Sequence, residues 1–322
     1  AFKMNQLRLE ARGDINDWLS YRWRQRLNSS NTPHALDNLP SSIDYAMISV
    51  RLTDKFTTSI GKQAAAYGGF EYDLDPIEIY QYSDMIDYML FDFMTGITFS
   101  YQVNPTQEIA LQVVNSRTAS MKDIYGQLPA GIEESKAPLA YSVNWNGNFF
   151  NNTFRTRWSY SLLCQAKKYN NHFYALGNEL DLGKFSMYLD FYLSDEELDN
   201  RGIVSTLSRI QGDQPCVKNT RYESWVTKLN YRFRPKWNIF VKGMYENASV
   251  YKYADQLSKG KYRTAYGYFG SIEYYPMTEN LRFFASYIGR SYHFTNKAKQ
   301  LGAENYSTST LSIGLMYHIP LF

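Results

Sequence analysis

Apolar and polar side chains alternate with a period of two along most of this 322-residue chain. In the segment WLSYRWRQRL (18–27), arginines occupy every second position from 22 to 26, and Tyr21, Trp23 and Gln25 alternate with them. Because successive side chains of a β-strand point to opposite faces, this segment predicts a strand with guanidinium groups on one face and rings on the other. Fifteen segments show such alternation, among them 2–13, 43–53, 152–163, 221–233, 262–275 and 307–322.

The connections between these segments alternate in length. Short ones hold turn residues, as in GDIND, NPTQ and RPK. Long ones fall at 28–42, 64–92, 116–136, 194–219, 248–261 and 291–305, and the link at 167–170 is the one exception to the alternation. Alternating short and long connections are typical of an up-and-down antiparallel β-barrel of the outer membrane.

Rows of arginine on one face decide where such a sheet is stable. A soluble antiparallel sheet buries one face and wets the other. An outer-membrane barrel instead turns an apolar face to lipid and a polar face to a water-filled lumen, and its closure leaves no strand edge unpaired in lipid. We therefore predict an all-β transmembrane barrel that forms a single domain over residues 1–322, with a soluble all-β repeat as the alternative.

The direction of the strands predicts their number. The chain ends after a strand that follows a long loop, so its end is expected on the periplasmic side. Bacterial single-chain barrels have an even strand number and two periplasmic termini. We therefore expect sixteen strands, the first of which would precede Ala1; a miscounted pair would give fourteen or eighteen.

Composition and motifs disfavour several functional classes. The net charge is only +3, which argues against a nucleic-acid partner. The chain has neither CxxC nor a Cys/His cluster, so no metal or cofactor is expected, and it lacks GxSxG and HExxH. A barrel enzyme of the lipase or protease type and a surface receptor stay as alternatives. Cys164 and Cys216 are expected near the outer rim, where they would form either a disulfide or two free thiols.

The long connection 64–92 is unusually rich in acidic and aromatic residues and contains no lysine or arginine. The run Asp75-Pro76-Ile77-Glu78 predicts the start of a short helix. Its aromatic side chains need a surface to pack against, so we expect the segment to fold into the barrel; a solvated acidic surface loop is the alternative. Its acidic candidates for a pore constriction are Glu71, Asp73, Asp75, Glu78, Asp84 and Asp87.

The stretch GKQAAAYGGFEYDLDPIEIYQYSD (61–84) resembles Bacteroidetes members of the phosphate-selective porin O and P family. The segment IALQVVNSR (109–117) and the terminal Phe322 are similar to features of the same family. The resemblance implies a trimeric, sixteen-stranded, water-filled pore in the outer membrane of a Gram-negative bacterium, with its third loop folded inward.

The expected function is passive diffusion of small hydrophilic solutes and ions through a constriction between the acidic loop and a basic wall. Glu71, Asp73, Asp75 and Glu78 are expected to face the arginines at 22, 24 and 26; an anion- or phosphate-selective channel is the alternative. The basic wall is expected to comprise Arg8, Arg12, Arg22, Arg24, Arg26, Arg51, Arg155 and Arg157.

The expected partners are outer-membrane lipid, lipopolysaccharide and two further copies of the chain in a homotrimer. The run SDEELD (194–199) is expected to form an acidic outer loop. Such a loop would either bind divalent cations that bridge lipopolysaccharide or be simply solvated.

Overall fold

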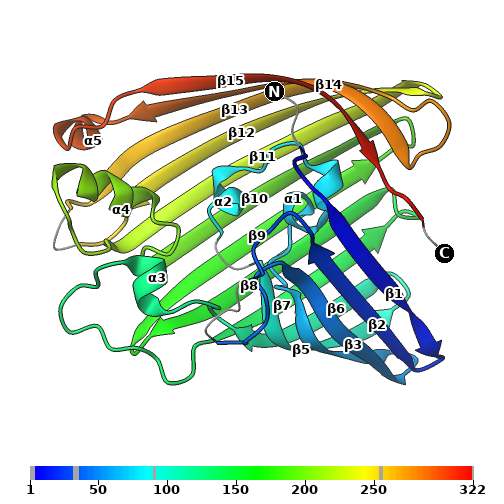
Figure 1. Ribbon diagram of the computed structural model, residues 1–322, viewed down its shortest axis with the longest axis horizontal. Helices are drawn as coiled ribbons and strands as arrows, with labels where there is room; N and C mark the ends of the chain where they lie inside the picture. Colours follow the sequence, from blue (N-terminus) through cyan, green and yellow to red (C-terminus); the bar gives the residue numbers. More distant parts are fainter. Residues whose placement is uncertain (1–3, 32–35, 90–91, 254–256, 321–322) are drawn as a thin grey trace.

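In the part of the chain that the structure describes, fifteen antiparallel strands form one sheet, in which every strand pairs with its neighbours in the sequence. This computed structural model describes residues 4–31, 36–89, 92–253 and 257–320. The sheet curves around an interior that holds the short helices α1 (Phe70–Asp73) and α2 (Asp84–Asp87) (Figure 1). No helix in the described ranges is long and apolar enough to cross a membrane. The expected sixteenth strand would lie before Ala1 and stays a prediction.

The strands lengthen toward the middle and the end of the chain. The longest is β11, which has 17 residues. In order, the strands are β1 (Arg8–Asn16), β2 (Leu19–Arg26), β3 (Ile43–Thr53), β4 (Phe56–Ala64), β5 (Phe93–Asn104), β6 (Gln107–Asn115), β7 (Leu139–Phe149), β8 (Phe154–Ala166), β9 (Tyr169–Asp181), β10 (Phe185–Leu198), β11 (Lys218–Arg234), β12 (Trp237–Val250), β13 (Gly260–Tyr274), β14 (Leu281–Phe294) and β15 (Tyr306–Tyr317).

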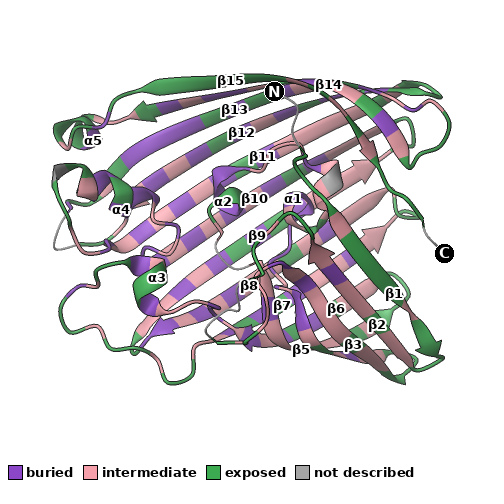
Figure 2. Ribbon diagram, in the orientation of Figure 1, coloured by how far each residue is buried: buried purple, intermediate pink, exposed green. Residues whose placement is uncertain are grey.

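The two faces of the sheet differ in the way that the alternation predicts. On β10, the side chains at even positions from Tyr188 to Leu198 point inward and are buried, while Leu189 on the other face is exposed. Figure 2 shows the resulting stripes of buried and exposed residues along the central strands. The outer face carries large exposed apolar side chains such as Trp225, Val241 and Tyr268, which suits contact with lipid.

Short turns lie at one end of the barrel and long loops at the other, as expected (Figure 1). The β1–β2, β3–β4 and β5–β6 turns have two residues each, whereas the β10–β11 loop spans 199–217. The long loops contain three further helices, α3 (Met121–Tyr125), α4 (Ile203–Ser208) and α5 (Asn296–Gln300), and the 3₁₀ turn η2 (Arg209–Gln211).

The acidic run 194–199 is not the outer loop that was expected, because its first five residues extend β10. Its charges are neutralised locally instead. Asp195 lies 2.6 Å from Arg221 on β11, and the buried Glu196 pairs with Arg201. These ion pairs offset the negative charges at the end of β10.

Of the two alternatives left open for the cysteines, the structure shows two free thiols, Cys164 and Cys216. Cys164 follows the alternation of β8 and lies on the half-buried outer face, whereas Cys216 is buried. Cys216 packs with Met121, Tyr125 and Leu198 in a small apolar cluster under the long loops. The two thiols therefore belong to different environments.

Candidate functional site

The connection between β4 and β5, residues 65–92, folds into the barrel and is called the inward loop here. It contains α1 (Phe70–Asp73), the 3₁₀ turn η1 (Pro76–Glu78) and α2 (Asp84–Asp87). Apolar side chains hold it against the wall: the ring of Phe70 stacks on Tyr188 at 6.4 Å, and Tyr67 meets the edge of Phe173 at 5.3 Å. The aromatic residues of this loop thus find their packing surface inside the barrel.

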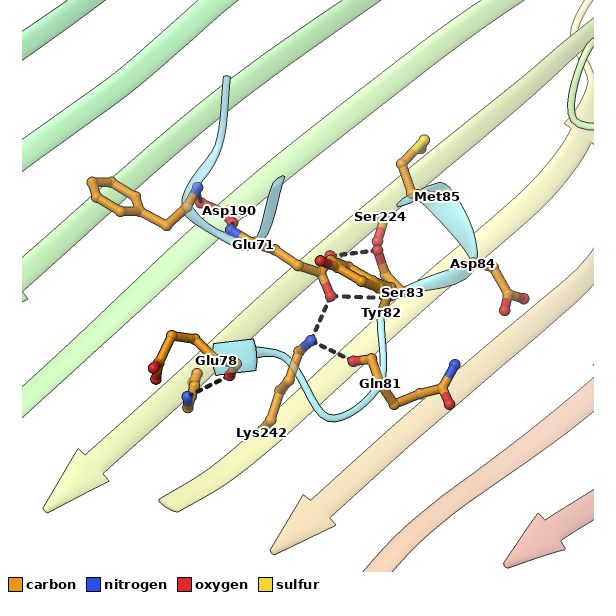
Figure 3. Close-up of polar contacts among 12 residues, drawn as sticks. Glu71, Glu78, Gln81, Tyr82, Ser83, Asp84, Met85, Asp190, Ser224 and Lys242 are labelled. Atoms are coloured by element: carbon orange, nitrogen blue, oxygen red, sulfur yellow. Dashed lines mark hydrogen bonds and ion pairs between the residues drawn. The ribbon is translucent and has the colours of Figure 1, made fainter. Parts of the chain in front are cut away.

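Three of the six acidic candidates in the inward loop are neutralised by the far wall, which comprises β10–β14. Glu71 is fully buried, pairs with Lys242 of β12, and accepts hydrogen bonds from the amide and hydroxyl of Ser83 at 2.8 and 2.5 Å (Figure 3). The expectation that Glu71 faces the arginines of β2 is therefore wrong. Burial is tolerated because the charge is paired and its oxygens are hydrogen-bonded.

Glu78 and Asp84 also pair with the far wall rather than with β2. Glu78 lies 3.0 Å from Arg282 of β14. Asp84 is buried and lies 2.5 Å from both Arg263 of β13 and Arg290 of β14. These ion pairs attach the loop to three adjacent strands of the far wall.

The remaining acidic candidates, Asp73, Asp75 and Asp87, line a cavity of about 630 Å³. On its other side lies the arginine row, defined as Arg8, Arg22, Arg24 and Arg26 of β1 and β2. Nη1 of Arg24 lies 3.7 Å from Oδ2 of Asp75. The cavity thus has a basic face on the barrel wall and an acidic face on the inward loop.

Asp44 of β3 forms ion pairs with three arginines of the row. This fully buried carboxylate lies 3.0 Å from Nε of Arg24, 3.0 Å from Nε of Arg26 and 3.8 Å from Nε of Arg8. The ring of Tyr45 adds a cation–π contact to Arg22 at 3.7 Å. One negative charge behind the row offsets the mutual repulsion of its guanidinium groups.

The other expected wall arginines lie elsewhere and are not among the described residues that line this cavity. Arg157 of β8 lies 3.8 Å from Asp73, so it still reaches the inward loop. Arg155 pairs with Glu179 of β9 at 2.5 Å. Arg12 and Arg51 are exposed on β1 and β3.

Sequence reasoning missed the basic residues that bind the loop on the far wall. Lys242, Arg263, Arg282 and Arg290 all occupy inward positions of strands in which side chains alternate. That alternation was the available signal, because it assigns each of them to the lumen face. It does not say which loop residue each one meets.

Burial changes the acidity of the loop carboxyls that line the cavity. Desolvation raises the pKa of Asp73 to about 6, against the opposing effect of Arg157, although 37% of the Asp73 side chain is exposed. It raises the pKa of Asp92 to about 7. The pKa of Asp87 is also raised, first by burial and then by the neighbouring charge of Asp84. The acidic face of the cavity is therefore sensitive to mildly acidic pH.

A family model described as phosphate-selective porin O and P matches residues 1–319. The chain belongs to this family. It is an outer-membrane porin, so the family, the location and the channel function expected from the sequence are confirmed. A comparison with curated protein sequences gave no match.

Solved outer-membrane structures share the fold of this porin at low sequence identity. The outer membrane channel DcaP of Acinetobacter baumannii is 9% identical with a TM-score of 0.65, over 97% of this chain and 84% of that chain. An anion-selective porin from Comamonas acidovorans is 9% identical with a TM-score of 0.58, over 97% and 88%. The trimer form of OmpT from Vibrio cholerae is 14% identical with a TM-score of 0.50, over 97% and 90%.

Proposed function

We propose that solutes cross this porin by passive diffusion and that the cavity between the arginine row and the inward loop is its constriction. The observation that carries this proposal is the placement of opposite charges on opposite sides of one cavity. Among the described residues, five basic and five acidic side chains line it. The basic ones are Arg8, Arg22, Arg24, Arg26 and Lys62. Of the acidic ones, Asp73, Asp75, Asp87 and Asp92 belong to the inward loop, whereas Asp44 of β3 lies on the basic side and pairs with Arg24 and Arg26.

Such an arrangement creates a field across the pore rather than a net charge within it. Low-dielectric walls focus the field between the two faces. A dipolar solute turns its negative end toward the arginine row and its positive end toward the loop. A field of this kind favours small polar and zwitterionic solutes over one retained ion.

An anion-selective channel is the second candidate, and the pairing of the loop acids favours it. Glu71, Glu78 and Asp84 are already neutralised by basic residues of the far wall. Burial also raises the pKa of Asp73 to about 6, which weakens the acidic face below neutral pH. The arginine row would then dominate the field.

Reversal potentials in planar bilayers separate these two candidates. In a tenfold KCl gradient near neutral pH, the balanced constriction gives a reversal potential close to zero. A potential near the chloride limit would support the anion-selective channel and count against the balanced one. Absence of any conductance from the folded, reconstituted protein would overturn both.

We also propose that this porin acts as a channel and not as an enzyme, and that it forms a homotrimer surrounded by outer-membrane lipid and lipopolysaccharide. The exposed apolar side chains of the outer face support the lipid contact. The trimer form of a structure with the same fold supports the oligomeric state. Chemical crosslinking of the detergent-solubilised protein tests it, and a purely monomeric pattern would contradict it.

A further inference from the structure

Two carboxylates of the far wall bind backbone amides of the inward loop. Asp190 of β10 accepts hydrogen bonds from the N–H groups of Phe70 at 3.0 Å and Glu71 at 2.7 Å. Glu246 of β12 accepts from those of Asp84 at 3.1 Å and Met85 at 3.0 Å. Each carboxylate therefore holds the first two residues of one of the four-residue helices, α1 or α2.

The opposite ends of the same two helices carry the acidic face of the constriction. α1 ends at Asp73 and α2 ends at Asp87, and both side chains line the 630 Å³ cavity. A shift of either helix against the wall would move its terminal aspartate by a similar amount, because each helix is a single rigid turn. The position of each acid in the lumen thus depends on a carboxylate behind the loop.

Basic residues of the wall bind backbone carbonyls of the loop in the same way. Nζ of Lys242 donates to the carbonyl of Gln81 at 2.8 Å (Figure 3). The other such bonds from the far wall join Lys228 to Glu78 at 3.3 Å and Arg290 to Tyr82 at 3.2 Å, and Arg201 of the β10–β11 loop donates to the carbonyl of Met85 at 3.1 Å. A loop buried inside a barrel must satisfy its backbone polar groups, and here charged wall side chains do so.

Gly177 of β9 has no side chain, and this allows the inward loop to approach Asp190 closely. A Cβ atom on Gly177 of β9 would lie 2.7 Å from Cα of Gly69 and 2.8 Å from Oδ1 of Asp190. Gly177 is the register partner of Asp190, so the gap opens directly beside the carboxylate. The wall is therefore shaped at this point to receive the backbone of α1.

We propose that Asp190 and Glu246 are positioning residues that set the location of Asp73 and Asp87, and through them the width and charge of the constriction. The part that concerns selectivity rests on the proposed function. The hydrogen bonds accepted by Asp190 and Glu246 come from the loop backbone rather than from loop side chains. These two residues therefore fix the path of the loop, and the loop side chains that face the cavity are free to set the chemistry of the pore.

Amide hydrogen exchange of the folded protein in detergent tests the positioning directly. Asp190→Asn keeps the shape of the side chain but leaves one acceptor for two amides, so exchange at residues 70 and 71 should rise about tenfold or more. Exchange at 84 and 85 should change little. Glu246→Gln should give the reverse pattern. Asp195→Asn, on the same strand but paired with Arg221 away from the loop, is the matched control.

A second variant keeps every charge and tests the same contact if Asp190→Asn fails to fold. Gly177→Ala places a methyl group between the loop and Asp190 and should also raise exchange at residues 70 and 71. Gly270→Ala on β13 is its control, because a Cβ atom there meets nothing within 4 Å. Unchanged loop exchange in the folded variants would overturn the positioning role.

Reversal potentials of the same variants separate this role from the proposed constriction. Faster exchange together with altered ion selectivity supports both. Faster exchange at unchanged selectivity supports the positioning of the loop and refutes the constriction at Asp73 and Asp87.

Discussion

Arg24 and Asp75 meet across the lumen, with Nη1 of the arginine 3.7 Å from Oδ2 of the aspartate. The two side chains differ in exposure: that of Arg24 is 4% exposed and that of Asp75 is 36% exposed. Asp44 fixes Arg24 from behind at 3.0 Å, so the guanidinium cannot follow a moving solute. The pair therefore marks a fixed basic wall opposite a more accessible acidic loop.

Removing the acidic face should favour anions. The triple change Asp73→Asn, Asp75→Asn and Asp87→Asn leaves Asp92 as the remaining acid among the described loop residues that line the cavity opposite the arginine row. One charge a few ångströms from the ion path is worth about 1 kcal/mol in water, so the chloride-to-potassium permeability ratio should rise about fivefold. The reversal potential in a tenfold KCl gradient measures it. Glu133→Gln, an exposed loop change, is the control, and an unshifted potential at normal conductance would contradict the constriction.

Removing the basic face should favour cations. Arg22→Gln, Arg24→Gln and Arg26→Gln together delete three of the four charges of the arginine row. The same bilayer measurement should then shift by a similar factor in the opposite direction. A shift toward anions, or none, would show that ions do not pass between the two faces.

Two arginines of the row, Arg24 and Arg22, should differ in how much they contribute to the unfolding free energy. Arg24→Gln removes a buried partner of the fully buried Asp44 and should cost about 3 kcal/mol of unfolding free energy. Arg22→Gln removes a partly exposed pair with Glu10 and should cost less than about 1 kcal/mol. Equilibrium unfolding in guanidinium, followed by tryptophan fluorescence, compares the two. Equal costs would mean that Asp44 does not depend on Arg24.

Ion selectivity should depend on pH through the loop acids. The pKa of Asp73 is raised to about 6 and that of Asp92 to about 7, so both carboxyls lose their charge as the pH falls from about 8 to about 5. Anion preference should therefore increase toward acidic pH. In Asp73→Asn, the change in anion preference at the more acidic end of this pH range should disappear. The change at the less acidic end, which comes from Asp92, should stay. A pH profile identical to that of the unmodified protein would contradict the role of Asp73.

Cys216 should resist thiol reagents in the folded protein. It is 1% exposed, and burial raises its pKa to about 12, so the reactive thiolate is scarce at neutral pH. After denaturation without a reductant, both Cys164 and Cys216 should be labelled, because both are free thiols. Mass spectrometry counts the labels, and a denatured protein that takes up none would require a disulfide after all.

The sequence by itself determined the strands and their faces. Side-chain alternation is a local property of a pleated chain, so WLSYRWRQRL is enough to place Arg22, Arg24 and Arg26 on the lumen face. The acidic and aromatic content of residues 64–92 was likewise enough to predict that the loop folds inward. Both inferences depend only on neighbouring residues and on what water and lipid tolerate.

Only the tertiary structure decided which charges meet. Lys242 is 171 residues from Glu71, and their pairing depends on strand register and on the path of the loop. Asp44 gives the clearest case: strict alternation along β3 assigns it to the outer face, opposite Tyr45. The register shifts there, so that Arg24 pairs with Tyr45 and Gln25 with Ile43, and Asp44 is the extra residue. Such a bulge turns a side chain to the other face of the strand without changing the alternation of residue types around it. For this reason, the position of the Asp44 carboxylate beside the arginine row could not be predicted from the sequence.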